Sequence, residues 1–336
     1  MLKRILSVLL IIGCVCCMSA KGESMYRSSG FSGDIIEWNG HVIVVSMTKH
    51  LFSKLYRLFV VTPAECRCIM HKEVRSNEGL DYYSSNDIIT ERCVGTAAPL
   101  SYSTIYIKYS YCKASDTAGL RKENFTELPV EKNETINTTG GAILKYCDDH
   151  TLSRLNTNSG IWETLAVEND GLENRSGFFH ETSICFNKPE GLYYSPESDA
   201  VYQFPATKGA VPYSFVLYKD QLIYAEDGGI YACGKNNDVP VRIVSSGAGS
   251  DIRRTTDFCI ADDILYVCNF QRNHLMRVRL DNYEVLPALE IDYVSNTCFL
   301  IHNGYLYLIK ENRESVEYIS IIDLESGTEV KRHLIG

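Results

Sequence analysis

One motif occurs three times in the second half of the chain, as Tyr218-Lys219-Asp220-Gln221-Leu222-Ile223-Tyr224, Ile260-Ala261-Asp262-Asp263-Ile264-Leu265-Tyr266 and Ile301-His302-Asn303-Gly304-Tyr305-Leu306-Tyr307. These stretches align without gaps, and their last tyrosines follow one another at intervals of 42 and 41 residues. In each stretch an apolar segment leads into a turn containing Asp, Asn or Gly, and a second apolar segment follows. Asp, Asn and Gly tolerate the backbone angles of tight hairpin turns. Each stretch therefore predicts a β-hairpin, repeated at a nearly constant interval.

Two more short strands follow each of these hairpins. The predicted strands cover 230–233 and 239–244 in the first unit, 275–280 and 284–286 in the second, and 318–322 and 330–334 in the third. Four short strands in a repeat of about 40 to 45 residues are typical of one blade of a β-propeller. A single blade is a small sheet that cannot bury both of its faces, so blades stack around an axis. The sequence therefore predicts an all-β propeller.

Earlier parts of the chain fit the same repeat more loosely. Predicted strands at 34–38, 41–45, 55–61 and 66–70 make a first blade, with Asn39-Gly40 as its first turn. Segments 102–111 and 142–155 supply a second, interrupted blade, and 183–186, 192–194 and 201–204 supply a third. Six four-stranded blades account for residues 34–336 best, with seven as the alternative.

Two segments do not fit the strand pattern directly. Residues 113–140 are polar and lack a sustained period, which predicts a surface insertion between strands. Leu51, Leu55 and Leu58 have helical spacing, so residues 49–58 fit either a short helix or a loop followed by a strand.

The first 20 residues predict export from the cytoplasm. Lys3 and Arg4 precede an apolar run from Ile5 to Ile12, which is too short to span a bilayer and is typical of a signal peptide. Ile11-Ile12-Gly13-Cys14 fits the lipobox of bacterial lipoproteins, which predicts lipid attachment at Cys14. Cleavage after Ala20, with conventional secretion, is the alternative, and a retained anchor is a third. Residues 21–33 then form a linker to the propeller.

The charge of the chain excludes one class of partner. Residues 1–13 carry two basic residues and no acidic one, so the remaining chain has 31 Lys and Arg against 42 Asp and Glu, or −11. Nucleic-acid binding depends on basic surfaces, so it is not expected. Contact with a membrane is expected through a lipid anchor only.

Ten cysteines follow the signal segment, an even number that permits up to five disulfides in an oxidising compartment. The alternative is that several are buried free thiols, which pack as small apolar residues. They are scattered along the chain, so no zinc site is predicted, and no other metal or cofactor is expected. The ten are Cys66, Cys68, Cys93, Cys112, Cys147, Cys185, Cys233, Cys259, Cys268 and Cys298.

The lipobox-like start together with the repeated Asp/Gly turn and Leu-x-Tyr strand resembles the bacterial exported six-bladed propellers, which are often lipoproteins of unassigned function. The resemblance covers residues 215–336 directly and 34–212 by analogy. It implies an architecture and a compartment, and it brings no catalytic residues.

Few motifs suggest chemistry. Asn156-Thr157-Asn158-Ser159-Gly160-Ile161-Trp162 is close to the Asp-box turn of sialidases, but it has Asn for Asp and occurs once, so an ordinary hairpin turn is favoured. Other candidate site residues are few. Residues 168–171 and 226–229, Asp148-Asp149-His150 and Asp262-Asp263 are better explained as turns than as calcium ligands. Arg253-Arg254 is a candidate contact for an anionic ligand, although a solvated loop explains it better. The loop-end tyrosines Tyr213, Tyr283 and Tyr293 are candidate ligand contacts, although most of the 22 tyrosines are expected to pack in the core. Glycosylation sequons occur at Asn124, Asn133, Asn137 and Asn174 and matter if the host is eukaryotic.

These observations favour an exported binding or scaffold protein that uses one propeller face to bind a protein, peptide or glycan. The alternatives are an exported propeller enzyme acting on carbohydrate and a sensor or assembly subunit of an envelope complex. The sequence does not decide whether the protein is an enzyme, and it favours binding over catalysis.

Overall fold

The computed structural model describes residues 33–335 apart from short internal gaps. These gaps are 86, 98–103, 131–133, 140–141, 148–150, 168–177, 181–182, 186–190, 196–199, 205–213, 220, 227–228, 235–238, 246–256, 269–273, 292–298 and 312–315.

Seven four-stranded antiparallel sheets form the described part of the chain, each from four consecutive strands. Blade 1 contains β1 (Gly33–Trp38), β2 (His41–Lys49), β3 (Ser53–Val61) and β4 (Cys66–Arg75), and blade 2 contains β5 (Glu78–Ser85), β6 (Ile88–Ala97), β7 (Thr104–Lys113) and β8 (Thr126–Leu128). Blade 3 contains β9 (Thr135–Thr139), β10 (Ala142–Tyr146), β11 (Thr151–Asn156) and β12 (Ile161–Val167), and blade 4 contains β13 (Phe178–His180), β14 (Ser183–Cys185), β15 (Gly191–Ser195) and β16 (Ala200–Phe204). Blade 5 contains β17 (Ser214–Tyr218), β18 (Gln221–Glu226), β19 (Gly229–Gly234) and β20 (Val241–Ser245), and blade 6 contains β21 (Asp257–Ala261), β22 (Ile264–Cys268), β23 (His274–Arg279) and β24 (Val285–Glu290). Blade 7 contains β25 (Phe299–His302), β26 (Tyr305–Glu311), β27 (Val316–Asp323) and β28 (Glu329–Leu334).

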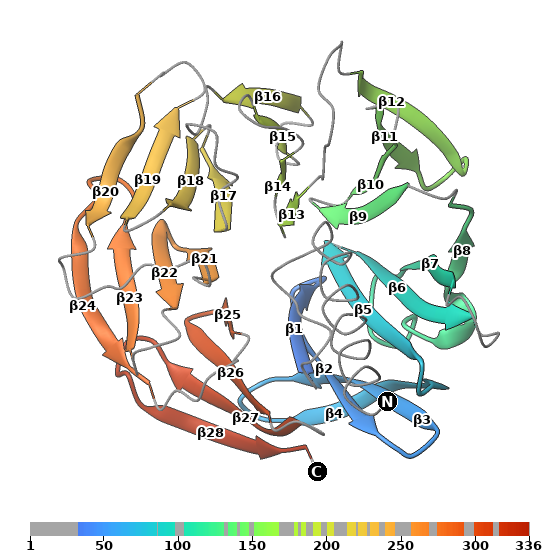
Figure 1. Cartoon of the computed structure of the whole chain (residues 1–336). Coiled ribbons are helices and arrows are strands. Elements are labelled where there is room, and N and C mark those ends of the chain that lie inside the picture. The colour runs from blue at the N-terminus through green and yellow to red at the C-terminus, as the bar shows by residue number, and fades with distance from the viewer. Residues whose placement is uncertain are drawn as a thin grey trace, which may run out of the picture.

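The blades are arranged in a ring, with the first strand of each blade nearest the axis and the fourth at the periphery (Figure 1). Neighbouring inner strands contact one another, for example β1 with β5 and β21 with β25, and β25 also contacts β1. The chain is therefore an all-β propeller, as predicted.

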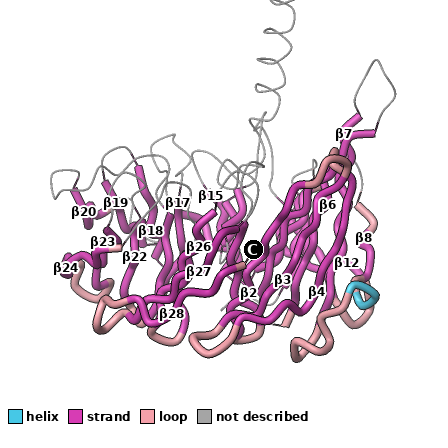
Figure 2. The backbone as a smooth tube through the Cα atoms, turned by 90° about the horizontal axis from the view of Figure 1, so that it is seen from below, coloured by secondary structure: helices cyan, strands magenta, loops and turns pink. Residues whose placement is uncertain are grey.

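The hairpin order gives the propeller two different faces, which lie at opposite ends of the strands (Figure 2). Because consecutive strands are antiparallel, the turns from first to second and from third to fourth strand lie on one side, called here the turn face. The connections from second to third strand and from blade to blade lie on the other side, called the loop face.

The inner turns have the geometry that the sequence predicted. Asn39-Gly40, Asp262-Asp263 and Asn303-Gly304 each join two strands directly, and all six residues have positive φ, between 47° and 77°. Two-residue hairpin turns of this kind match the right-handed twist of the flanking strands, and they require residues that accept positive φ. The aligned stretches at 218, 260 and 301 thus become the inner hairpins of blades 5, 6 and 7.

The core lies between the blades. In β2, Val42 and Val44 pack toward blade 7, whereas Ile43, Val45 and Met47 pack toward blade 2. Successive side chains of a strand point to opposite faces, and a strand buried on both faces therefore reads as a continuous apolar run. The repeated Leu-x-Tyr positions behave in the same way, because Tyr224, Tyr266 and Tyr307 are all buried. For these tyrosines, core packing is confirmed.

Blade 7 meets blade 1 directly, so that the ring closes without exchange of a strand between them. Apolar side chains of both blades form one buried cluster, which includes Val44 and Phe59 from blade 1 and Ile319 and Ile321 from blade 7. His333 Nε2 also donates a hydrogen bond of 2.9 Å to the carbonyl oxygen of Thr62. Side-chain packing between the first and last blades therefore closes the ring.

The blade number is seven, the alternative to the favoured six, because the segments assigned to one interrupted blade belong to two. Residues 104–113 lie in blade 2 and residues 142–156 in blade 3. The polar stretch 113–140, expected as an insertion between strands, contains β8 and β9 and thus joins these blades. Its polarity is compatible with strands because β8 is an exposed outer strand that buries only Leu128, and β9 buries Ile136.

Residues 49–58 form a loop followed by a strand, so the short helix is not present there. Among the described residues the helical content is one 3₁₀ turn, η1 (Lys122–Asn124).

Candidate functional site: the turn face

The described inner hairpin turns, those of blades 1, 2, 5, 6 and 7, lie around the axis on the turn face (Figure 1). The term turn ring is used here for their described polar residues, which are Glu37, Asn39, Asp87, Lys219, Asp262, Asp263, His302 and Asn303. At Gly40 and Gly304 a Cβ atom would meet nothing within 4 Å. The tips of these turns are therefore open to solvent and accessible to a ligand.

Blades 7, 1 and 2 are linked through the turn ring. His302 Nδ1 lies 3.4 Å from Glu37 Oε1, and Asn303 Nδ2 lies 2.8 Å from His302 Nε2. Asn303 Nδ2 can donate to His302 Nε2 when the ring proton is on Nδ1, the nitrogen that faces Glu37. The hydroxyl of Ser84 donates to the carbonyl oxygen of Glu37. Three blades thus hold each other's turn residues in place.

Blades 5 and 6 are linked by a second set of contacts. Lys219 Nζ lies 2.9 Å from Asp263 Oδ1, and the Tyr218 hydroxyl donates to the same oxygen. These two donors hold the pKa of Asp263 below its usual value, the tyrosine contributing most. Exposed ion pairs add little to stability, so these contacts link the turns of two blades without contributing much to the folded state. The Tyr283 hydroxyl donates to Gln221 Oε1 over 3.1 Å, which places this loop-end tyrosine in the same contact between blades.

Four of the described carboxylates lack the raised pKa of a glycosidase acid. The pKa values of Glu78, Asp263, Asp323 and Glu329 are all lowered, in each case chiefly by hydrogen bonds to the charged form. A general acid in glycoside hydrolysis needs a raised pKa instead. In the part of the chain that the structure describes, no three His, Cys, Asp or Glu residues are grouped to hold a metal ion. The turn ring therefore offers hydrogen-bonding groups in fixed positions, which suits recognition of a polar ligand.

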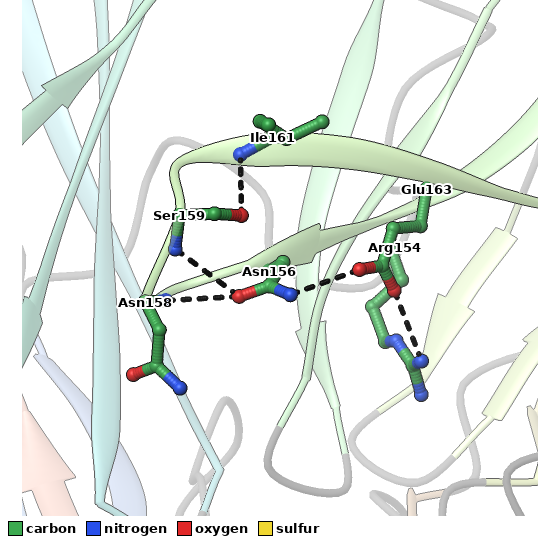
Figure 3. A network of polar contacts seen from close by, with 6 residues as sticks. All are labelled: Arg154, Asn156, Asn158, Ser159, Ile161 and Glu163. Carbon is green, nitrogen blue, oxygen red and sulfur yellow. Dashed lines mark hydrogen bonds and ion pairs between the residues drawn. The ribbon is translucent and has the colours of Figure 1, made fainter.

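The sialidase-like stretch forms a self-contained hairpin turn between β11 and β12 (Figure 3). Asn156 Oδ1 accepts hydrogen bonds from the backbone nitrogens of Asn158 (3.1 Å) and Ser159 (3.2 Å), and Asn156 Nδ2 donates to Glu163 Oε1 over 2.9 Å. Gly160 completes the turn with φ of 70°. Lys145 Nζ lies 5.0 Å from the centre of the Trp162 ring. The contacts of Asn156 act within the hairpin of β11 and β12 and explain the motif as local structure, whereas Lys145 belongs to the neighbouring strand β10.

A second copy of this turn lies at Asp323–Thr328 of blade 7. The sequence analysis did not identify this copy. Asp323 Oδ1 accepts from the backbone nitrogen of Ser326 over 2.7 Å, and Gly327 has φ of 68°. In both turns the serine Oγ accepts from the backbone nitrogen two residues later. The shared signal is Asn or Asp, two residues of any type, then Ser-Gly, and it marks the third-to-fourth strand turn of two blades.

A buried charged group, which sequence reasoning also missed, lies between blades 1 and 2. Glu91 of β6 is 4% exposed; it forms an ion pair with Lys72 of β4 and accepts a hydrogen bond of 2.9 Å from the hydroxyl of Tyr82 of β5. Burial, followed by the charge of Glu91, raises the pKa of Tyr82 well above its usual value. The group lies at the interface between blades, so its role is in stability rather than in ligand contact.

The predicted site residues are placed as follows. Asn124 lies in η1, where its side chain is exposed and donates to the carbonyl oxygen of Gly119 over 2.7 Å. Asn137 lies in the inner strand β9. Asp262-Asp263 forms an inner turn. Outside the described residues lie Cys14, Asn133, Asn174, Asp148-Asp149-His150, residues 168–171, Arg253-Arg254, Tyr213 and Tyr293.

Among the described cysteines, Cys66, Cys68, Cys93 and Cys112 are free thiols. Burial raises the pKa of Cys66 to about 11, so it is protonated at neutral pH. Of these four cysteines Cys112 is buried, as the alternative of buried free thiols expects, whereas Cys68 is exposed. No helix in the described ranges is long and apolar enough to cross a membrane.

No protein-family model matches this chain, and no curated protein matches it. Solved structures with a similar fold include the computationally designed protein Ika8, at 10% identity over 92% of this chain and 88% of that chain, with a TM-score of 0.49. The C-terminal WD40 domain of Sif2 is 11% identical over 90% and 84% of the two chains, with a TM-score of 0.45. A chain of a nidogen/laminin complex is 9% identical over 76% and 93%, with a TM-score of 0.42.

Proposed function

We propose that this protein is an exported propeller that binds a peptide, protein segment or glycan on its turn face. The observation that carries the proposal is the turn ring, in which exposed polar groups of several blades are held in fixed positions by contacts between the blades. Groups positioned in advance lose less conformational entropy when a ligand binds. Ligands rich in hydroxyl, amide or charged groups are the class that such a surface recognises.

Enlarging two tips of the turn ring tests this proposal. In the double variant Gly40→Asn with Gly304→Asn, asparagine accepts positive φ and fills space that is open at both positions. We expect ligands found by screening the wild-type protein against a glycan array and a peptide library to bind this variant at least about tenfold more weakly, a loss of about 1.4 kcal/mol.

Gly160→Asn is the matched control, because Gly160 also has positive φ and open space but lies in an outer turn of blade 3. Equal weakening by Gly160→Asn, or unchanged binding by the double variant, would contradict the assignment of the site. Ligands that are cleaved, as measured by mass spectrometry, would instead support the carbohydrate-active enzyme.

The location of the protein is part of the proposal. The lipobox at residues 11–14 supports attachment of a lipid to Cys14, which would hold the propeller at a membrane surface. Cys14→Ser is expected to move the protein from the membrane fraction to the soluble fraction, as measured by fractionation and immunoblotting. Membrane association that persists in Cys14→Ser would contradict lipid attachment and favour a retained anchor. Release of the wild-type protein into the medium would favour secretion.

A further inference from the structure

The hairpin of β2 and β3 extends beyond the inner strand of blade 1 on the loop face. Gly33, the first residue of β1, pairs with Ser46, and β2 continues for three more residues to Lys49. A strand rises about 3.4 Å per residue, so the tip of the hairpin lies about 10 Å beyond the start of β1. The name hairpin tip is used here for residues 49–54.

Two large apolar side chains at the hairpin tip are exposed to solvent. Leu51 is 83% exposed and Phe52 is 81% exposed. The backbone that carries them is held on both sides, because the His50 nitrogen donates to the Ser53 carbonyl over 2.8 Å and the Ser76 nitrogen donates to the Phe52 carbonyl over 3.1 Å. An adjacent, exposed apolar pair on a fixed turn is a feature of interaction sites.

The charged groups around the hairpin tip are mostly basic where they face solvent. Lys49 pairs with Lys54 across the hairpin, and Arg75 of β4 lies opposite Ser53. Burial, followed by repulsion from Lys49, lowers the pKa of Lys54. His50 and Glu73 are also exposed, and Glu73 accepts a hydrogen bond from the Ser53 hydroxyl.

A second acidic side chain among the described neighbours of the hairpin tip, Glu78, is hydrogen-bonded. Glu78 accepts hydrogen bonds from the backbone nitrogen of Arg75 (2.9 Å) and from the Tyr106 hydroxyl. Three cations, Lys49, Lys54 and Arg75, lie around the apolar pair, against the two carboxylates of Glu73 and Glu78, so one net positive charge remains among these groups. The Lys54 ammonium also donates a hydrogen bond of 2.6 Å to the backbone carbonyl of Glu78. The combination complements a surface that is anionic outside and apolar beneath.

We infer that the hairpin tip inserts Leu51 and Phe52 into the surface of an anionic lipid bilayer, with Lys49, Lys54 and Arg75 at the headgroups. This inference rests on the proposed lipid attachment at Cys14. The chain enters β1 at Gly33 on the same loop face, 19 residues after Cys14, and an extended chain of this length reaches at most about 65 Å. A contact of this kind adds to the membrane affinity that the lipid supplies.

The acidic charge of the whole chain does not prevent this contact, because charges farther than about 8 to 10 Å from the headgroups are largely screened at physiological ionic strength. With the loop face toward the bilayer, the turn face points to solvent, where a ligand can reach the turn ring.

Quenching by brominated lipids tests the inference on the full, lipidated chain. Phe52→Trp places an indole at the hairpin tip, and Ile161→Trp places one at a position that is 63% exposed on the turn face. In vesicles of brominated phosphatidylcholine and phosphatidylglycerol, we expect the tryptophan introduced at position 52 to lose most of its emission and shift to shorter wavelength. The tryptophan introduced at position 161 is expected to match the wild-type background.

The outcomes separate this inference from the proposed anchor. Absence of quenching at position 52 while the protein floats with the vesicles would overturn the inference and leave the anchor standing. If Cys14→Ser leaves fractionation unchanged while position 52 is quenched, the anchor fails and the hairpin contact stands. Equal quenching in vesicles of phosphatidylcholine alone would overturn the role of the cations. An emission shift that requires added cell protein would assign the tip to a protein partner and overturn membrane insertion.

Discussion

Ile321→Ala is expected to lower the free energy of unfolding by roughly 2 to 5 kcal/mol. Ile321 is fully buried in the cluster that joins blade 7 to blade 1, together with Val44 and Phe59 of blade 1. The substitution removes three buried carbon atoms and leaves a cavity at the contact that closes the ring. Urea denaturation followed by circular dichroism measures the change.

Two controls separate ring closure from general loss of apolar area. Ile321→Val removes one methyl group at the same place and is expected to cost about 0.5 to 1.5 kcal/mol. Val330→Ala lies on the outer strand β28, where the side chain is 47% exposed, and is expected to change stability by about 0.5 kcal/mol or less. A loss below 1 kcal/mol for Ile321→Ala would show that the contact between blades 7 and 1 is not part of the cooperative core.

Glu91→Ala is expected to cost about 3 kcal/mol or more of unfolding free energy. The change leaves the Lys72 ammonium, 24% exposed, without its ion-pair partner, and it leaves the Tyr82 hydroxyl without the acceptor of its hydrogen bond. Removal of one partner of a buried pair is strongly destabilising because an uncompensated charge remains in the interior. Thermal and urea denaturation of the variant measure the effect.

The double variant Glu91→Leu with Lys72→Met distinguishes an uncompensated charge from lost packing. Replacement of both charges by apolar side chains of similar size is often nearly neutral, so the double variant is expected to regain most of the stability. A double variant as unstable as Glu91→Ala would show that the two charges are not coupled. Lys108, which is 65% exposed beside Glu127 on blade 2, provides a surface comparison, since Lys108→Met is expected to have little effect.

The sequence predicted blades 5, 6 and 7 but missed blade 2. The difference lies in whether the polar groups of a strand are satisfied within the blade or by a neighbouring blade. Blades 5, 6 and 7 have turns of Asp, Asn or Gly and apolar second strands, and these signals are local. Strand β6, in contrast, buries Thr90 and Glu91 in its centre. A strand with a central glutamate is stable here because Lys72 comes from the neighbouring blade. That partner is 19 residues away in the sequence and cannot be inferred from local pattern.

The candidate site was only partly accessible to sequence analysis. Tyr283 was identified as a loop-end tyrosine, and the structure places it against Gln221 of the neighbouring blade. The pairing of His302 with Glu37 brings together residues from the two ends of the propeller, and no spacing in the sequence indicates it. The exposure of Leu51 and Phe52 was likewise hidden, because the same leucine spacing also fits an amphipathic helix.

By itself, the sequence determined the strand repeat, the inner turns and the all-β class, because hairpin turns and strand alternation depend on residues a few positions apart. It also carries the export prediction, which is local to the first 20 residues. The tertiary structure alone decided the number of blades, the closure of the ring, the turn ring and the projection of the hairpin tip. These features depend on contacts between blades, where residues far apart in the chain satisfy each other's charges, hydrogen bonds and apolar surface.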